Sequence, residues 1–231
     1  QLQKIAEQSG KQIFAYQNRR WSSDIMAARE VVQSGILGTI IEMHLRFDRY
    51  RPTIGPKLFK ETPVPGSGIW YDLGSHLIDQ AISIFGTSCN FYSYKNKYRD
   101  GAQVPDFGFM HLVFDQTNVF ITTSMLVADA QAGIVIHGTK GSFIKEFCDV
   151  QEAQLLQGML PTDPKYGQEE ANKEGILTLI SENGTIQKSK IASKKGAFNE
   201  LFNSVFSSIR QGAPYPITNA QIAKQLELLE N

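Results

Sequence analysis

The stretch GTIIEMHLRFDRYRP, residues 38–52, constrains the fold more than any other part of this chain. Its apolar residues fall on one side and its polar residues on the other: Ile41, Met43, Leu45 and Phe47, then Glu42, His44, Arg46 and Asp48. Because successive side chains of a strand point to opposite faces, this alternation predicts a long strand with one core face and one polar face.

Further strands are predicted at residues 90–98, 106–114, 118–127 and 133–138. Short turns such as DQTN and GTKGS separate them, which is typical of antiparallel hairpins. The sequence also predicts a hairpin over LTLISENGTIQKSKI, closed by Asn183-Gly184, the strongest short turn signal. The segment QIFAY (12–16) is a short strand candidate, and the polar cluster that follows it is typical of a ligand-binding strand end.

Helical spacing of apolar residues predicts helices at residues 2–9 and 22–33 and two more near the end of the chain. The first of those two ends before Gly212, and the second begins at Thr218, where Gln221 completes a capping box. Residues 150–175 are expected to be irregular. The predicted fold is α/β of the α+β type: one mixed, mainly antiparallel open sheet with helices packed on one face.

The composition limits the class of protein. Of 231 residues, 42% are hydrophobic and 20% are charged, which excludes a disordered or fibrous chain. Basic and acidic residues number 23 each, so no overall charge favours nucleic acid or an anionic membrane. No apolar run reaches the roughly 20 residues of a membrane span. The cysteines, Cys89 and Cys148, lack disulfide or zinc-ligand spacing, and we expect a cytoplasmic protein.

The segment GSGIWYDLGSHLIDQA (66–81) carries the best candidate chemistry. On a helix Asp72, His76 and Asp79 share one face, at i, i+4 and i+7. Histidine titrates nearest neutral pH, and a carboxylate one turn away can orient it, so the pair suits acid–base work on an alcohol or carbonyl. The alternative is an ordinary solvated helix surface, and spacing alone does not decide between them. No ligand set for a metal is spaced nearby.

Five motifs, taken in order, resemble one family. They are YQNRRWSSD (16–24), GILGTIIE (35–42), FDRYRP (47–52), GSGIWYDLGSHLIDQ (66–80) and HGTKGSF (137–143). Together they resemble the C-terminal domain of the Gfo/Idh/MocA family of NAD(P)-dependent sugar and polyol dehydrogenases. The residues of the third and fourth motifs are similar to those of the scyllo-inositol dehydrogenase-like branch.

The resemblance implies a domain division. The fold would be that of a glyceraldehyde-3-phosphate dehydrogenase-like C-terminal domain. Residues 1–20 would be the last helix and strand of a Rossmann domain, and residues 21–231 a substrate-binding and dimerisation domain. The sequence contains neither the family's glycine-rich phosphate loop nor its Glu-Lys-Pro triplet. We therefore expect the cofactor, NAD or NADP, to be bound mainly outside this chain, and the isolated chain to be inactive.

The resemblance also implies roles for individual residues. Asp72 and His76 match the family's Asp-x-Gly-x-His pair, in which the histidine accepts the substrate proton and the aspartate is its hydrogen-bonding partner. The implied substrate-binding residues are Arg19, Trp21, Arg49 and Tyr71, with Arg51 beside them; the implied cofactor-binding residues are Gln17 and Asn18. Arg19 and Trp21 have a simpler interpretation as a surface arginine and a packing tryptophan, and Arg49 and Arg51 as solvated charges at a strand end. For Asp79, helix stabilisation or a salt bridge is favoured over a direct role.

The implied function is hydride transfer between NAD(P) and a hydroxyl of a sugar or an inositol-like polyol. The polar sheet face is expected to pair two copies into a homodimer, with no nucleic-acid or membrane partner. Two alternatives stay open: a non-catalytic binding or oligomerisation module on the same scaffold, and a parent protein that uses NAD for glycoside cleavage.

Overall fold

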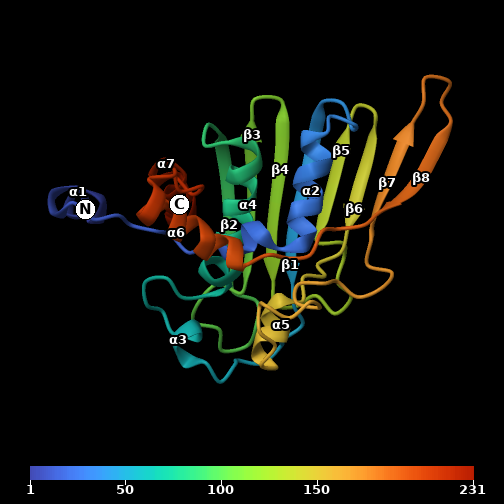
Figure 1. The fold of residues 1–231 in the computed structure, drawn as a ribbon. Coiled ribbons are helices and arrows are strands. Elements are labelled where there is room, and N and C mark those ends of the chain that lie inside the picture. The colour runs from blue at the N-terminus through green and yellow to red at the C-terminus, as the bar shows by residue number, and fades with distance from the viewer.

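A computed structural model describes residues 1–231, and its centre is one eight-stranded sheet (Figure 1). The strand order across the sheet is β2-β3-β4-β1-β5-β6-β7-β8. The strands are β1 (Ile40–Asp48), β2 (Asn90–Asn96), β3 (Phe107–Phe114), β4 (Thr117–Ser124), β5 (Ile134–Gly138), β6 (Gly141–Lys145), β7 (Gly175–Ile180) and β8 (Ile186–Ile191). The predicted mixed, mainly antiparallel open sheet is confirmed.

Only β1 and β4 are paired in parallel; every other neighbouring pair is antiparallel. Their carboxyl ends lie side by side, with Asp48 opposite Ser124. In open sheets ligands bind outside such ends, so this edge of the sheet is the first place to look for a site.

Helices cover one face of the sheet, and α2 and α4 lie directly in front of it in Figure 1. The helices are α1 (Leu2–Ser9), α2 (Ser23–Gln33), α3 (Leu58–Glu61), α4 (Ser75–Phe85), α5 (Gln151–Leu156), α6 (Asn199–Gln211) and α7 (Asn219–Glu230). A 3₁₀ turn, η1 (Asn18–Trp21), precedes α2, and a π-helical turn, η2 (Trp70–Gly74), precedes α4.

The core lies between this helical layer and the sheet. The fully buried Ile25 of α2, Ile78 of α4 and Leu228 of α7 pack with Met43 and Ile121 of the central strands in one cluster of 24 residues. Burial of this apolar surface is the main stabilising contribution to the fold. The opposite side of the sheet, which we call the open face, keeps its side chains partly exposed.

Three sequence predictions were wrong. Residues 12–16 form no strand, because their backbone pairs with no neighbouring strand; they lead from α1, set apart at the left of Figure 1, to the main body. Ile41 is 42% exposed, because a bulge between Ile40 and Glu42 turns Ile40 into the core instead. The segment 150–175, expected to be irregular, contains α5.

The terminal helices follow their end signals. Gly10 and Gly212 end α1 and α6 in the left-handed conformation, with φ of 62° and 68°. Thr218 and Gln221 form the predicted capping box of α7. No helix combines the length and the apolar character needed to cross a membrane.

Candidate functional site

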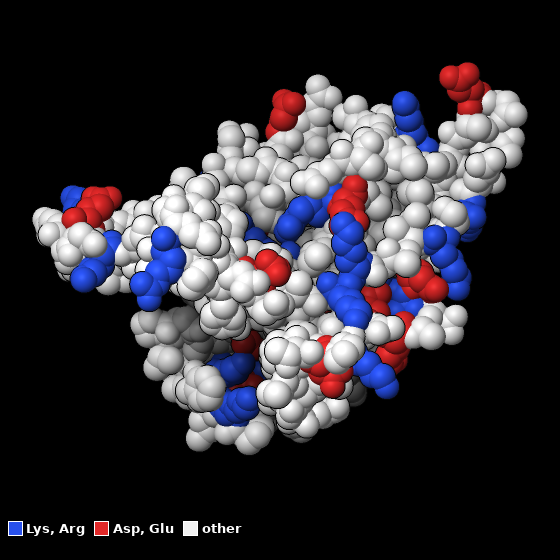
Figure 2. Space-filling view, in the orientation of Figure 1, with Lys and Arg blue, Asp and Glu red and all other residues white.

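The candidate site is a cavity of about 520 Å³ beside the carboxyl end of β1, where η2 and the first turn of α4 meet α5. Its polar lining includes Asn18, Arg19, Arg49, Lys60, Asp72, His76 and Glu152. Figure 2 shows charged side chains recessed between the α3 and α5 regions, below the helical layer. Segments far apart in the sequence therefore supply one polar hollow.

The backbone of the GSG segment sets the approach to this cavity. Gly66 and Gly68 have φ of 83° and 89°, which side chains disfavour. A Cβ atom at Gly68 would also lie only 3.1 Å from the carbonyl oxygen of Pro105. The amide of Ile69 donates to the Pro105 carbonyl oxygen at 3.2 Å, so Gly68 lets the chain before η2 lie close to the segment that leads into β3.

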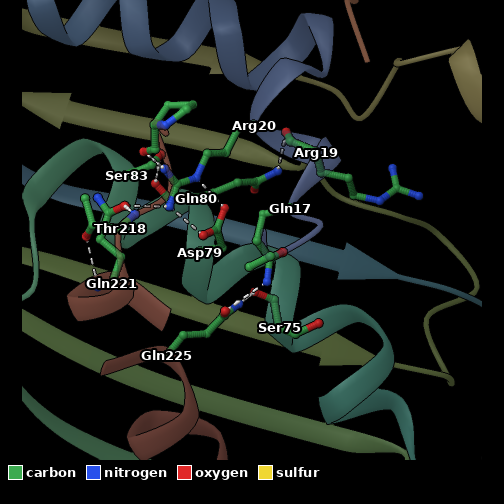
Figure 3. Close-up of polar contacts among 12 residues, drawn as sticks. Gln17, Arg19, Arg20, Ser75, Asp79, Gln80, Ser83, Thr218, Gln221 and Gln225 are labelled. Carbon is green, nitrogen blue, oxygen red and sulfur yellow. Dashed lines mark hydrogen bonds and ion pairs between the residues drawn. The ribbon is translucent and has the colours of Figure 1, made fainter. Parts of the chain in front are cut away.

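The three polar residues predicted to share one helix face have different environments in the structure. Asp72 and His76 line the cavity, whereas Asp79 is only 2% exposed and binds Arg20. Both guanidinium contacts of Arg20 with the Asp79 carboxylate are short, at 2.7 and 2.8 Å (Figure 3). Asp79 thus makes a salt bridge, the interpretation favoured from the sequence.

Asp72 lies among cations. Its Oδ1 atom accepts a hydrogen bond from Lys60 Nζ at 2.5 Å, and its Oδ2 atom lies 3.7 Å from Arg49 Nη1. The Asp72 side chain keeps 27% of its surface exposed, toward the cavity. The Asp72 oxygens that face the cavity are available to accept a further hydrogen bond from a hydroxyl group.

His76 is set up as a neutral imidazole. Burial and the nearby Arg19 charge lower its pKa to about 4, against the opposing effect of Asp72. Its Nδ1 atom is buried and has no hydrogen-bond partner in the protein. Since most buried polar atoms are paired, an unpaired nitrogen on a side chain that lines the cavity favours a ligand with a hydroxyl or carbonyl group there.

Arg19 extends away from the Arg20 cluster in Figure 3 and reaches the cavity. Its Nη2 atom binds Glu152 Oε2 of α5 at 2.5 Å, and its guanidinium lies 5.4 Å from the centre of the Phe47 ring. The predicted excursion 150–175 therefore supplies a wall of the cavity through α5.

The remaining predicted site residues are divided between the cavity and its support. Asn18 lines the cavity, and Tyr71 lines a smaller adjoining hollow with Asp72 and His76. Gln17 instead donates to the side chain of Gln225 at 2.8 Å, and Gln225 donates to the Ser75 carbonyl oxygen at 2.5 Å (Figure 3).

Trp21 does not line the cavity. Its carbonyl oxygen accepts hydrogen bonds from Gln151 and Ala197, so its backbone ties η1 to α5 and to the chain before α6. Gln17 and Trp21 therefore connect the segments around the cavity without lining it. The predicted contact of Gln17 with the cofactor and that of Trp21 with the substrate stay predictions.

Sequence reasoning missed Lys60 and Glu152. Lys60 lies 12 residues before Asp72 in the short helix α3, and Glu152 lies in the segment expected to be irregular. Neither has a spacing to Asp72 or His76 that marks it, so only the fold brings them together. No group of three His, Cys, Asp or Glu side chains is arranged to hold a metal ion.

Comparison with known proteins decides the family. The family model for the GFO/IDH/MocA C-terminal domain matches residues 25–144. The chain belongs to the GFO/IDH/MocA family. The match covers α2, β1, α4 and the strands up to β6, and thus Asp72 and His76.

Several GFO/IDH/MocA relatives match nearly the whole chain. The uncharacterized oxidoreductase YdgJ of Escherichia coli is 29% identical over 100% of this chain and 65% of its own length. The scyllo-inositol 2-dehydrogenase (NADP(+)) IolW of Bacillus subtilis is 29% identical over 99% of this chain and 63% of its own.

Solved structures agree. A crystal structure of an oxidoreductase from Bacillus cereus is 30% identical, with a TM-score of 0.88 over 100% of this chain and 67% of that one. The chain thus spans about two thirds of the length of these relatives. The resemblance to GFO/IDH/MocA oxidoreductases inferred from the motifs is confirmed.

Proposed function

We propose that this chain supplies the substrate-binding half of an oxidoreductase that transfers a hydride between NAD(P) and a carbinol carbon of a sugar or polyol. The observation that carries the proposal is that His76, whose buried Nδ1 atom is unpaired, and Asp72 line the same cavity. The family membership and the name of the relative IolW, which includes scyllo-inositol and NADP(+), support the substrate class and the cofactor.

His76 would handle the proton of the reacting hydroxyl. Its neutral ring offers one nitrogen lone pair, so it accepts a hydrogen bond from the substrate and then takes the hydroxyl proton as the carbonyl forms. Asp72, whose charge raises the pKa of His76, stabilises the resulting imidazolium. Arg49 and Lys60 are within reach of the other hydroxyls and hold the carbinol carbon in one orientation.

The cavity rim fits the approach of a nicotinamide ring. Tyr16, Leu155 and Leu156 line it and are 56%, 44% and 83% exposed. On α6, Phe202 and Phe206 are also exposed, at 59% and 58%, with the Phe202 ring 6.0 Å from that of Tyr16. We propose that a nucleotide-binding domain docks here. NAD(P)⁺, when bound, supplies the hydride acceptor. This chain has no glycine-rich phosphate loop for its pyrophosphate.

The test compares the 231-residue chain with a protein that joins it to a nucleotide-binding domain of the family. We expect NAD(P)H formation from inositols or aldoses only with the joined protein, and a loss of about 10²-fold or more in kcat for His76→Ala and Asp72→Asn. Lys188→Gln on exposed β8 is the matched control. Turnover by the 231-residue chain alone would contradict the proposal that a separate nucleotide-binding domain is required.

The same assay separates the alternatives. If the joined protein binds NAD(P) and releases a hydrolysed sugar from glycosides without net NAD(P)H, the glycoside-cleaving alternative is correct. If it turns over neither class, the scaffold is a non-catalytic module.

We also propose a homodimer through the open face. One row of cross-strand neighbours on this face is largely apolar and aromatic; it runs Tyr92, His111, Phe120, His44, Val135, Ile144 and Ile176. No other part of the chain covers the row, and Tyr92 and Ile144 are 61% and 41% exposed. A flat face of this kind can pair with its own copy about a two-fold axis.

A further inference from the structure

A second cavity, of about 330 Å³, adjoins the first and shares Arg49, Lys60, Asp72 and Glu152 with it. It lies between the loop before α3 and the segment that follows β4, and its charged atoms belong to the recessed patch of Figure 2. Five cationic side chains and three carboxylates line it: Arg49, Arg51, Lys57, Lys60 and Arg99, with Glu61, Asp72 and Glu152. The excess positive charge is not balanced within the cavity.

The three carboxylates are already paired. Glu61 binds Arg99 at 2.7 Å, Asp72 binds Lys60 at 2.5 Å, and Glu152 binds Arg19 at 2.5 Å. Arg99 also binds Asp106 at 3.1 Å and is only 2% exposed at its side chain, so its charge is used within the protein. These pairs leave no carboxylate for the other cations.

Arg51 and Lys57 make no side-chain hydrogen bond and no salt bridge, and both are exposed to the cavity. The ion pair of Arg49 with Asp72 is long, at 3.7 Å, and the Arg49 guanidinium also lies 5.2 Å from the centre of the Phe47 ring. Burial and the neighbouring Arg51 charge lower the pKa of Arg49, which shows that the two guanidinium groups repel each other. An anion between them would remove this repulsion and satisfy several donors at once.

Hydrogen bonds fix the backbone that carries Arg49 and Arg51. The amides of Arg49 and Arg51 donate to the carbonyl oxygens of Ser124 and Met125 at 2.8 and 2.7 Å, so the two side chains leave the same side of an extended segment. Arg99 clamps the opposite wall, through Glu61 and through the Thr53 carbonyl oxygen at 3.2 Å. A preorganised set of donors binds an anion better than mobile surface lysines do, because less ordering is needed on binding.

We propose that this second cavity, with Arg51, Lys57 and Arg49 as its donors, binds an anionic substituent, a carboxylate or a phosphate, of the substrate. This inference rests on the proposed function, because it assigns the substrate class: a sugar or polyol that carries one acidic group. Asp72 lies at the border of both cavities, so the anionic end is fixed near Arg51 while a hydroxyl is presented to His76.

The experiment measures dissociation constants for the 231-residue chain by amide chemical-shift titration. The probes are inorganic phosphate, D-glucuronate, D-glucose 6-phosphate and D-glucose. We expect phosphate to shift the amides of residues 49–57, and at least one of the two acidic sugars to bind about tenfold or more tightly than glucose. Tighter binding of D-glucuronate would identify the anionic substituent as a carboxylate, and tighter binding of D-glucose 6-phosphate would identify it as a phosphate.

The double variant R51Q/K57Q should lose this preference, and Lys188→Gln, an exposed lysine outside the cavity, should keep it. Equal constants for the three sugars, absence of phosphate shifts at residues 49–57, or an unchanged preference in R51Q/K57Q would each overturn the proposal. If the joined protein turns over neutral polyols and the chain does not bind phosphate, the anion site is wrong and the proposed function stands. If the chain binds phosphate through Arg51 and Lys57 but the joined protein turns over no sugar, the proposed function is wrong and the anion site stands.

Discussion

At the scale of single residues, His76 shows what burial does to a motif. The sequence places it one turn from Asp72, whereas the structure half-buries its side chain and leaves Nδ1 without a partner. Its folded pKa of about 4 lies below the value near 6.5 of an unfolded chain. Because the folded state resists protonation, His76 contributes stability above pH 6.5, and this contribution is lost as the pH falls from 6.5 to 4.

We therefore expect the His76 ring to stay neutral to about pH 5 and to titrate near pH 4 in a ¹⁵N-detected NMR titration of the chain. Arg19→Gln should raise this pKa, because the Arg19 charge is the second largest cause of the shift, after burial. Asp72→Asn should lower it further. A midpoint near 6.5 in the unmodified chain would show that His76 is solvated and would remove the physical basis of its proposed role.

At the scale of elements, the buried pair Arg20–Asp79 joins η1 to α4 and to the segment before α7. Arg20 also donates to the Pro216 carbonyl oxygen at 2.9 Å and to Gln221 at 3.1 Å (Figure 3). These contacts hold the backbone from which Arg19 reaches the cavity. Asp79 thus positions the site without lining it.

Asp79→Asn should lower the free energy of unfolding by about 3–5 kcal/mol, because it leaves the buried Arg20 charge without its counter-ion. Urea denaturation of the chain measures this loss. The control is Glu227→Gln, which breaks the exposed i,i+3 pair with Lys224 on α7 and should cost less than about 1 kcal/mol. Similar losses in the two variants would mean that Arg20 finds another partner.

At the scale of the whole molecule, the helices lie against one face of the sheet and leave the open face without a second layer. Phe120 lies at its centre, stacked between His44 and His111 with ring centres 4.9 and 4.6 Å apart. In a homodimer through this face, Phe120 would lie near the two-fold contact and be fully desolvated.

We expect the chain to sediment at twice its mass in analytical ultracentrifugation, and Phe120→Lys to sediment as one chain with unchanged circular dichroism. Phe206→Lys on α6, an exposed phenylalanine outside the open face, is the matched control and should leave the dimer intact. A monomeric unmodified chain, or a Phe120→Lys dimer, would contradict this assembly.

The sequence by itself determined the layered fold and the two central polar residues. The alternation along β1 from Glu42 onward, the Asn183-Gly184 turn and the capping box of α7 are local patterns whose geometry follows from neighbouring residues, and each was found as predicted. Local pattern failed at residues 12–16, because a strand requires a partner that sequence alone does not supply, and at Ile41, because a bulge shifts the register by one residue.

Tertiary structure alone decided the environment of the site. It half-buried His76, paired Asp79 with Arg20, and brought Lys60 of α3 and Glu152 of α5 into the same cavity as Asp72. It also left Arg51 and Lys57 without partners beside the same cavity. The protonation state of a group, and whether its donors and acceptors are paired, depend on its neighbours in three dimensions. Spacing along the chain does not specify those neighbours.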